Sequence, residues 1–225
     1  MKNKIRFFDG GMGTMLQAAG LLGPGALPEP LNLTHPEEIA AIHQAYADAG
    51  AEFISTNTFG ANGLKFDNVE ELVQAATALV RRTGKKVVLD IGPLGKLLQP
   101  MGELAFDDAY DLFARTIRAG APGADLVLIE TMSDTLELKA AVLAAKENCD
   151  LPVFTTMIMD EKGRLLTGAD IETAVTMLAA GIPASSMVSS ADETAVLLCL
   201  FSGLILFALD AMVGRRLDAV LSTHK

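Results

Sequence analysis

The sequence predicts an α/β fold in which about five strand–helix units surround a parallel sheet. Short apolar runs rich in β-branched residues alternate with longer amphipathic stretches along most of the chain, and this alternation is typical of βα units. The 225 residues are enough to bury one substantial core. After Gly181 a linker-like stretch precedes an almost wholly apolar one, which indicates that the regular pattern ends there.

Each expected element follows from its local pattern. Short apolar runs that end in turn or polar residues predict strands at residues 5–8, 52–56, 86–91, 125–130 and 153–159. Apolar residues at helical spacing predict helices at residues 36–49, 69–83, 106–118, 135–147 and 171–180. Thr34 and Asp170 stand where the N-caps of the first and last of these helices are expected.

Composition excludes several classes of function. The net charge is −10 and the basic residues are not clustered beyond pairs, so a nucleic-acid partner is not expected. Cys149 and Cys199 are too few and too far apart for a disulfide framework, and the N-terminus does not resemble a signal peptide. We therefore expect a reducing, cytoplasmic setting.

Three strand ends carry polar groups that predict one shared small-molecule pocket. Asp9, Gly10 and Gly11 follow the first apolar run, Asn57 follows the second, and Glu130 ends the fourth. Carboxylates suit an ammonium group, and free backbone N–H groups at glycines suit a carboxylate. Read alone, the glycine segment is compatible with an ordinary strand-ending turn, and Asn57 with satisfying nearby backbone groups.

Together with Gly92-Pro93-Leu94-Gly95, which by itself suits a structural loop, these segments resemble the homocysteine-binding domain of the homocysteine S-methyltransferase family. The similarity is greatest to the first module of the cobalamin-dependent members, and it runs from about residue 5 to about residue 178. It implies a protein that transfers a methyl group to the thiol of homocysteine, giving methionine. It also implies that Asp9 and Glu130 hold the amino group of homocysteine, that the Gly10-Gly11 backbone holds its carboxylate, and that Asn57 lines the pocket.

The resemblance further implies a (β/α)8 barrel, of which this chain supplies only part. Such a barrel needs eight strands, and about five strand–helix units are recognisable. We divide the chain into a partial homocysteine-binding barrel domain at residues 1–180, a linker-like segment at 181–194, and an apolar, helical tail at 195–225. The fold class predicted is thus an incomplete barrel with an atypical C-terminal tail.

Zinc is the cofactor that the resemblance implies, bound by a cysteine after an asparagine near the sixth strand and by a cysteine pair in a glycine-rich turn. Neither motif occurs in this sequence. Cys149 does follow Asn148, but it precedes the fifth predicted strand and so belongs to the opposite face of a barrel. Cys199 lies in the tail, and His35 and His43 do not have the spacing of metal ligands. We therefore assign no catalytic or metal-binding residue and expect little methyl transfer from this chain alone, since the cobalamin and folate modules would also lie in further sequence.

The apolar tail leaves several interpretations open. Residues 195–209 are fifteen, fewer than the roughly 20 that a membrane-spanning helix needs, so a buried or aggregation-prone helix is favoured over a membrane span. The tail is also compatible with a frame change, a fusion or a truncation. The alternative functions are a non-catalytic amino-acid-binding or interaction module that pairs with another chain, and a membrane-attached remnant.

Overall fold

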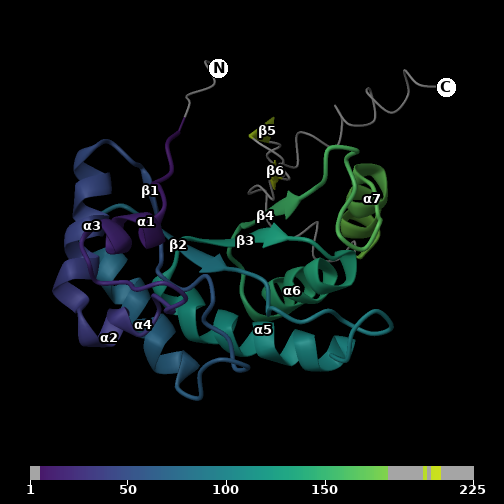
Figure 1. Cartoon of the computed structure of the whole chain (residues 1–225), viewed down its shortest axis with the longest axis horizontal. Coiled ribbons are helices and arrows are strands. Elements are labelled where there is room, and N and C mark those ends of the chain that lie inside the picture. The colour runs from purple at the N-terminus through teal and green to yellow at the C-terminus, as the bar shows by residue number, and fades with distance from the viewer. Residues whose placement is uncertain (1–5, 182–199, 202–203, 209–225) are drawn as a thin grey trace.

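The computed structural model describes residues 6–181, 200–201 and 204–208 and contains one sheet with helices packed against it (Figure 1). Four parallel strands form most of the sheet: β1 (Phe53–Ser55), β2 (Lys86–Ile91), β3 (Leu126–Met132) and β4 (Val153–Ile158). Two further strands, β5 (Leu200–Phe201) and β6 (Leu204–Ala208), complete the order β1-β2-β3-β4-β6-β5. Because β1 and β5 do not pair with each other, the barrel is incomplete in the part of the chain described.

Seven α-helices connect and flank these strands in the described residues. They are α1 (Met12–Ala18), α2 (Leu31–Thr34), α3 (Pro36–Asp48), α4 (Val69–Arg81), α5 (Phe106–Gly120), α6 (Thr135–Asn148) and α7 (Ile171–Gly181). Figure 1 shows α4, α5 and α6 along one side of the parallel strands. A short 3₁₀ helix, η1 (Ala121–Gly123), follows α5.

The main core lies between the parallel strands and the helices α4 to α6. Leu89 and Ile129 from the strands pack in one buried cluster with Phe113, Ile117 and Leu138 from the helices. The parallel strands are mostly apolar because packed helices and neighbouring side chains cover them, as in other parallel sheets. This packing fixes the carboxyl ends of β1, β2 and β3 side by side, which is where the polar strand ends meet.

Four of the five predicted strands and all five predicted helices are confirmed, with small differences in their ends. Of the first predicted strand, at residues 5–8, the described part forms an isolated parallel bridge between Phe8 and Phe53, with Asp9 N donating to Phe53 O at 3.0 Å. The pairing ends there because the chain turns into α1, which begins at Met12. Asp170 caps α7 as predicted, since its Oδ1 accepts a hydrogen bond from Thr173 N at 3.0 Å.

The N-cap prediction for Thr34 is wrong. Thr34 is the last residue of α2, a one-turn helix that the sequence analysis did not find, and its hydroxyl donates to Pro30 O at 3.2 Å. His35 precedes α3 instead, and its side chain makes no capping hydrogen bond. The hydroxyl of Thr34 therefore belongs to the preceding turn, so it does not cap the following helix.

The helix predicted within residues 195–209 is also wrong for the part that the structure describes. Residues 200–201 and 204–208 form strands, and β6 pairs antiparallel with β4, with Thr156 opposite Leu206. The edge of β4 offers unpaired backbone groups, and an apolar segment satisfies them by adding a strand. The predicted linker at 181–194 and most of the tail, Cys199 included, lie outside the described residues apart from Gly181. Among the helices described, none has the length and apolar character to cross a membrane.

Candidate functional site

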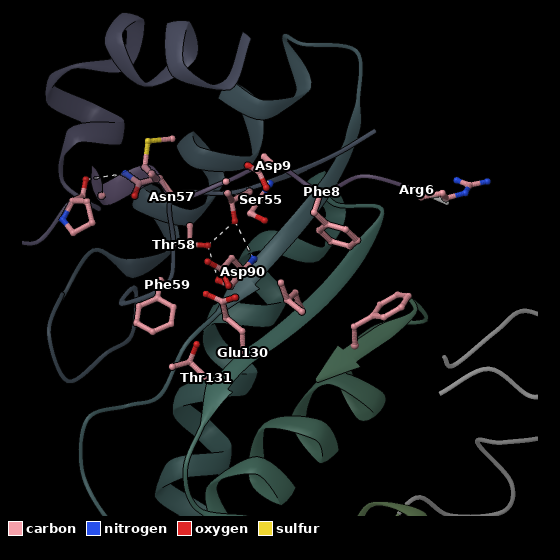
Figure 2. Close-up of a pocket in the computed structure, with 18 residues that line it drawn as sticks. Arg6, Phe8, Asp9, Ser55, Asn57, Thr58, Phe59, Asp90, Glu130 and Thr131 are labelled. Carbon is pink, nitrogen blue, oxygen red and sulfur yellow. Dashed lines mark hydrogen bonds between the residues drawn. The ribbon is translucent and has the colours of Figure 1, made fainter. Parts of the chain in front are cut away.

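A cavity of about 750 Å³ lies where the predicted polar strand ends meet (Figure 2). Its wall includes residues 8–13, residues 55–59 at the end of β1 and after it, Asp90 in β2, and Glu130 and Thr131 in β3. All five residues predicted for the site line this one cavity: Asp9, Gly10, Gly11, Asn57 and Glu130. The structure therefore brings them together, and what they bind remains a prediction. We call this cavity the acid pocket, after its three carboxyl groups Asp9, Asp90 and Glu130.

Asp9 is held at the pocket by the β1 strand end. Its Oδ2 accepts a hydrogen bond from Ser55 N at 2.9 Å. Burial raises the pKa of Asp9 to about 6, although the hydrogen bond from Ser55 acts in the opposite direction. The group is thus ionised near neutral pH but takes up a proton in mildly acidic solution.

Glu130 lies two residues after Leu128 on β3, and both line the pocket because alternate residues of a strand share a face. Burial raises the pKa of Glu130, and the neighbouring Asp9 adds to the shift. The next residue, Thr131, has a φ of 65°, which is uncommon for a β-branched residue. Its N–H donates to Thr156 Oγ1 at 2.7 Å, at a register shift between β3 and β4. This irregularity sets the direction in which the end of β3 presents its side chains.

Asp90 is the third acid of the pocket, and the sequence analysis missed it. It sits in the apolar strand β2 and is only 7% exposed. Burial raises its pKa well above the usual value, and the charges of Glu130, Asp9 and Glu29 add to the effect. The sequence did contain one sign of Asp90, since it is a single acid within an apolar strand. A buried carboxyl group without a structural partner indicates a functional role.

Two threonines fix the backbone of Asp90. Asp90 N donates to Thr56 Oγ1 at 3.1 Å, and Thr58 Oγ1 donates to Asp90 O at 2.7 Å. The two hydroxyl oxygens lie 2.6 Å apart, and since the single proton of Thr58 is used on Asp90 O, the proton of Thr56 must join them. Both hydroxyl protons are therefore committed away from the carboxyl group of Asp90.

The Gly10-Gly11 turn packs against Tyr46 of α3. A Cβ added at Gly10 would lie 3.0 Å from the Tyr46 hydroxyl oxygen, so only glycine fits there without displacing the ring. Tyr46 donates its hydroxyl to Gly11 O at 3.1 Å. The backbone N–H groups of Gly10 and Gly11 donate to no acceptor among the described residues, which leaves them available to a bound anion.

Asn57 uses its side chain to hold the loop before α2. Its Nδ2 donates to Pro28 O at 2.8 Å and to Asn32 Oδ1 at 3.1 Å. Asn32 in turn donates to Asn57 O at 2.8 Å. This pairing supports the structural interpretation of Asn57, since both protons of its amide nitrogen are used within the protein.

The segment from Gly92 to Gly95 borders the pocket through Phe59. Gly92 N donates to Phe59 O at 3.0 Å, and a Cβ on Gly92 would lie 2.5 Å from that oxygen. Leu94 N donates to Glu137 Oε1 at 2.7 Å, and burial raises the pKa of Glu137 to about 7. These contacts agree with the structural role expected for this loop.

The residues described do not fit a zinc ion. They contain no group of three histidine, cysteine or acidic side chains arranged to hold a metal. Cys149 follows α6 and precedes β4, so it lies at the opposite end of the strands from the pocket, as expected. Its thiol donates to Ala145 O at 3.3 Å. His43 is fully buried, and burial lowers its pKa to about 4. His35 pairs through Nδ1 with Thr34 Oγ1 at 2.9 Å.

The fold and the acid pocket together define an α/β protein of the barrel class with a cavity at the carboxyl ends of its strands. A model of the family described as homocysteine S-methyltransferase matches residues 6–196. The chain therefore belongs to the homocysteine S-methyltransferase family.

Similar proteins support this assignment. The methionine synthase of Mycobacterium tuberculosis is 35% identical over 204 residues, which cover 78% of this chain and 17% of that protein. The methionine synthase of Mycobacterium leprae is 34% identical over 203 residues, with the same coverage. The chain thus spans about a sixth of the length of these relatives.

Solved structures show the same fold. The metallated form of the Escherichia coli homocysteine methyltransferase MmuM superposes with a TM-score of 0.69 at 20% identity, covering 80% of this chain and 72% of that one. Its oxidised form gives a TM-score of 0.71 at 19% identity, covering 79% and 70%. These likenesses establish that the chain has the α/β fold of such methyltransferases, with the barrel incomplete.

Proposed function

We propose that the acid pocket binds homocysteine and forms the amino-acid half of a methyltransferase active site. Asp9 and Glu130 hold the ammonium group, and the N–H groups of Gly10 and Gly11 hold the carboxylate. The observation that carries the proposal is the meeting, in one cavity, of partly buried acids with backbone N–H groups that donate to no described acceptor. An α-amino acid presents the complementary pair of charges.

The metal half of the reaction is not supplied by the residues described. A thiol is mostly protonated at neutral pH, and zinc in this family would act as a Lewis acid that favours the thiolate. Since the described residues do not fit zinc, we propose that this chain alone binds homocysteine without transferring a methyl group to it. We also propose a cytoplasmic setting for this binding. Cobalamin and folate modules would belong to a longer relative.

Calorimetric titration with three ligands tests the binding. Homocysteine carries both charges, 4-mercaptobutanoate lacks the amino group, and 3-mercaptopropylamine lacks the carboxylate. Glu130→Gln removes one charge-assisted hydrogen bond, and we expect it to weaken homocysteine binding at least about tenfold. The same variant should leave the weaker binding of 4-mercaptobutanoate almost unchanged.

The exposed Glu103 provides the matched control. Glu103→Gln should bind homocysteine as the unmodified protein does. Equal affinity of the unmodified protein for homocysteine and 4-mercaptobutanoate would contradict the role of the two acids. Formation of methionine by the pure chain, with added zinc and methylcobalamin, would contradict the absence of methyl transfer.

A further inference from the structure

The acid pocket contains one more carboxyl group than the proposed function uses. Asp9 and Glu130 suffice to pair with a single ammonium group, yet Asp90 lines the same cavity, and Figure 2 shows it between them in this view. Three ionised carboxylates around one positive charge would leave an excess of negative charge in the pocket. Like charges at such close quarters favour the protonated form of the most buried member.

The geometry around Asp90 singles it out as that member. Its side chain is more than nine-tenths buried, and its Oδ1 has no hydrogen-bond partner in the described structure. Thr58 donates its hydroxyl proton to Asp90 O, and Thr56 donates its hydroxyl proton to Thr58 Oγ1. Neither proton is available to the carboxyl group of Asp90. An ionised Asp90 would thus leave its buried Oδ1 without the donor that a buried carboxylate oxygen requires.

No described cation compensates for this charge. The groups that act on Asp90 electrostatically are Glu130, Asp9 and Glu29, all acidic. Arg6 is the basic residue among those that line the cavity, and its guanidinium lies over the Phe53 ring, 5.8 Å from the centroid. Figure 2 shows the Arg6 side chain directed away from the three acids.

We propose that Asp90 holds a proton in the empty pocket and releases it to solvent when the ammonium group of a ligand enters. The inference rests on the proposed function, because it takes the amino-acid headgroup as the ligand. Only the O–H bond of Asp90 breaks: its proton passes to a buffer base, and the carboxylate left behind faces the ammonium group. The ligand's own covalent bonds do not change.

This exchange makes Asp90 a specificity-determining residue. A cation compensates for the ionisation of Asp90, whereas a neutral headgroup of the same shape does not. The protonated acid keeps the empty pocket from carrying three adjacent negative charges. The pocket therefore admits cationic amines and rejects their neutral isosteres.

Titration calorimetry in two buffers of different ionisation enthalpy measures the released proton. At about pH 7.5 we expect homocysteine binding to release a substantial fraction of one proton per molecule bound. In Asp90→Asn the release should fall by at least about half, because the amide cannot ionise. Asp111→Asn, an exposed residue on α5, is the matched control and should keep the full release. Unchanged release in Asp90→Asn would overturn the inference.

Infrared spectroscopy provides a second measurement that does not depend on ligand binding. At about pH 7.5 the spectrum of the free protein minus that of Asp90→Asn should contain the carbonyl stretch of a protonated carboxylic acid, because Glu137, with a pKa of about 7, contributes to both spectra alike. In the unmodified protein the band should lose this Asp90 contribution when homocysteine is added, a result that needs no variant to fold. Absence of the band from the difference between the two free proteins would refute the inference. Failure of homocysteine to bind, with the Asp90 band present, would instead refute the proposed function.

Discussion

Asp9 illustrates at the scale of one residue how the site opposes stability. Its pKa is raised to about 6 in the folded protein, against 3.8 for an ordinary aspartate, chiefly by burial. The native state therefore binds this proton more tightly than the unfolded chain does, and the contribution of Asp9 to the free energy of unfolding falls as pH rises from about 4 to about 6. Above that range the loss is complete and constant.

Asp9→Asn should consequently stabilise the protein at about pH 7.5, by about 1–3 kcal/mol, because the amide carries no charge to desolvate. Near pH 4 most of the gain should vanish, since Asp9 is then protonated in the folded protein and nearly half protonated in the unfolded chain. Urea unfolding at the two pH values measures the difference, and homocysteine affinity measured at about pH 7.5 should fall. A gain of equal size at both pH values would show that the charge of Asp9 is not its cause.

At the scale of elements, α3 supports the glycine turn through one side chain. Tyr46 packs against Gly10 and donates to Gly11 O at 3.1 Å. Tyr46→Phe keeps the ring but removes this hydrogen bond, and we expect it to lower homocysteine affinity by about 1 kcal/mol, since the turn loses one anchor. Gly10→Ala should lower the affinity more, because its Cβ must displace the ring. The two variants can be ranked by titration calorimetry, and the opposite ranking would contradict the packing role of the ring.

The elements differ in how well the sequence predicts them. The strands β2, β3 and β4 are short and mainly apolar, and α4 and α5 have clear amphipathic faces, so local pattern suffices for them. The helices α1 and α2 have only seven and four residues, too few for helical periodicity to be visible. Asp90 escaped notice because it continues an apolar strand. The pocket acids at strand ends were predictable, since the carboxyl ends of parallel strands share one edge.

At the scale of the whole molecule, the end of the parallel sheet and the acids of the pocket involve different strands. The parallel order ends at β4, where a complete barrel would continue with further parallel strands, and β6 pairs there in the antiparallel direction instead. The three acids lie on β2, on β3 and in the Asp9 turn, whereas β6 pairs with β4 and β5. β4 contributes Phe154 to the cavity wall but none of the three acids, so we expect the acids to keep their places when β6 is lost.

Disrupting β6 tests this expectation. In the double variant Ile205→Pro and Leu206→Pro, at least one substituted position loses a backbone N–H that the ladder uses, and we expect β6 to detach from β4. Hydrogen exchange should then accelerate in residues 153–158, and self-association should increase because the freed edge of β4 can pair with another chain. Homocysteine affinity should change by less than about threefold, since the pocket acids lie on other strands. The control Ile205→Val and Leu206→Val retains both N–H groups and should exchange like the unmodified protein. Unaltered exchange at β4 in the proline variant would mean that β6 does not protect this edge, and a large loss of affinity would mean that the pocket depends on it.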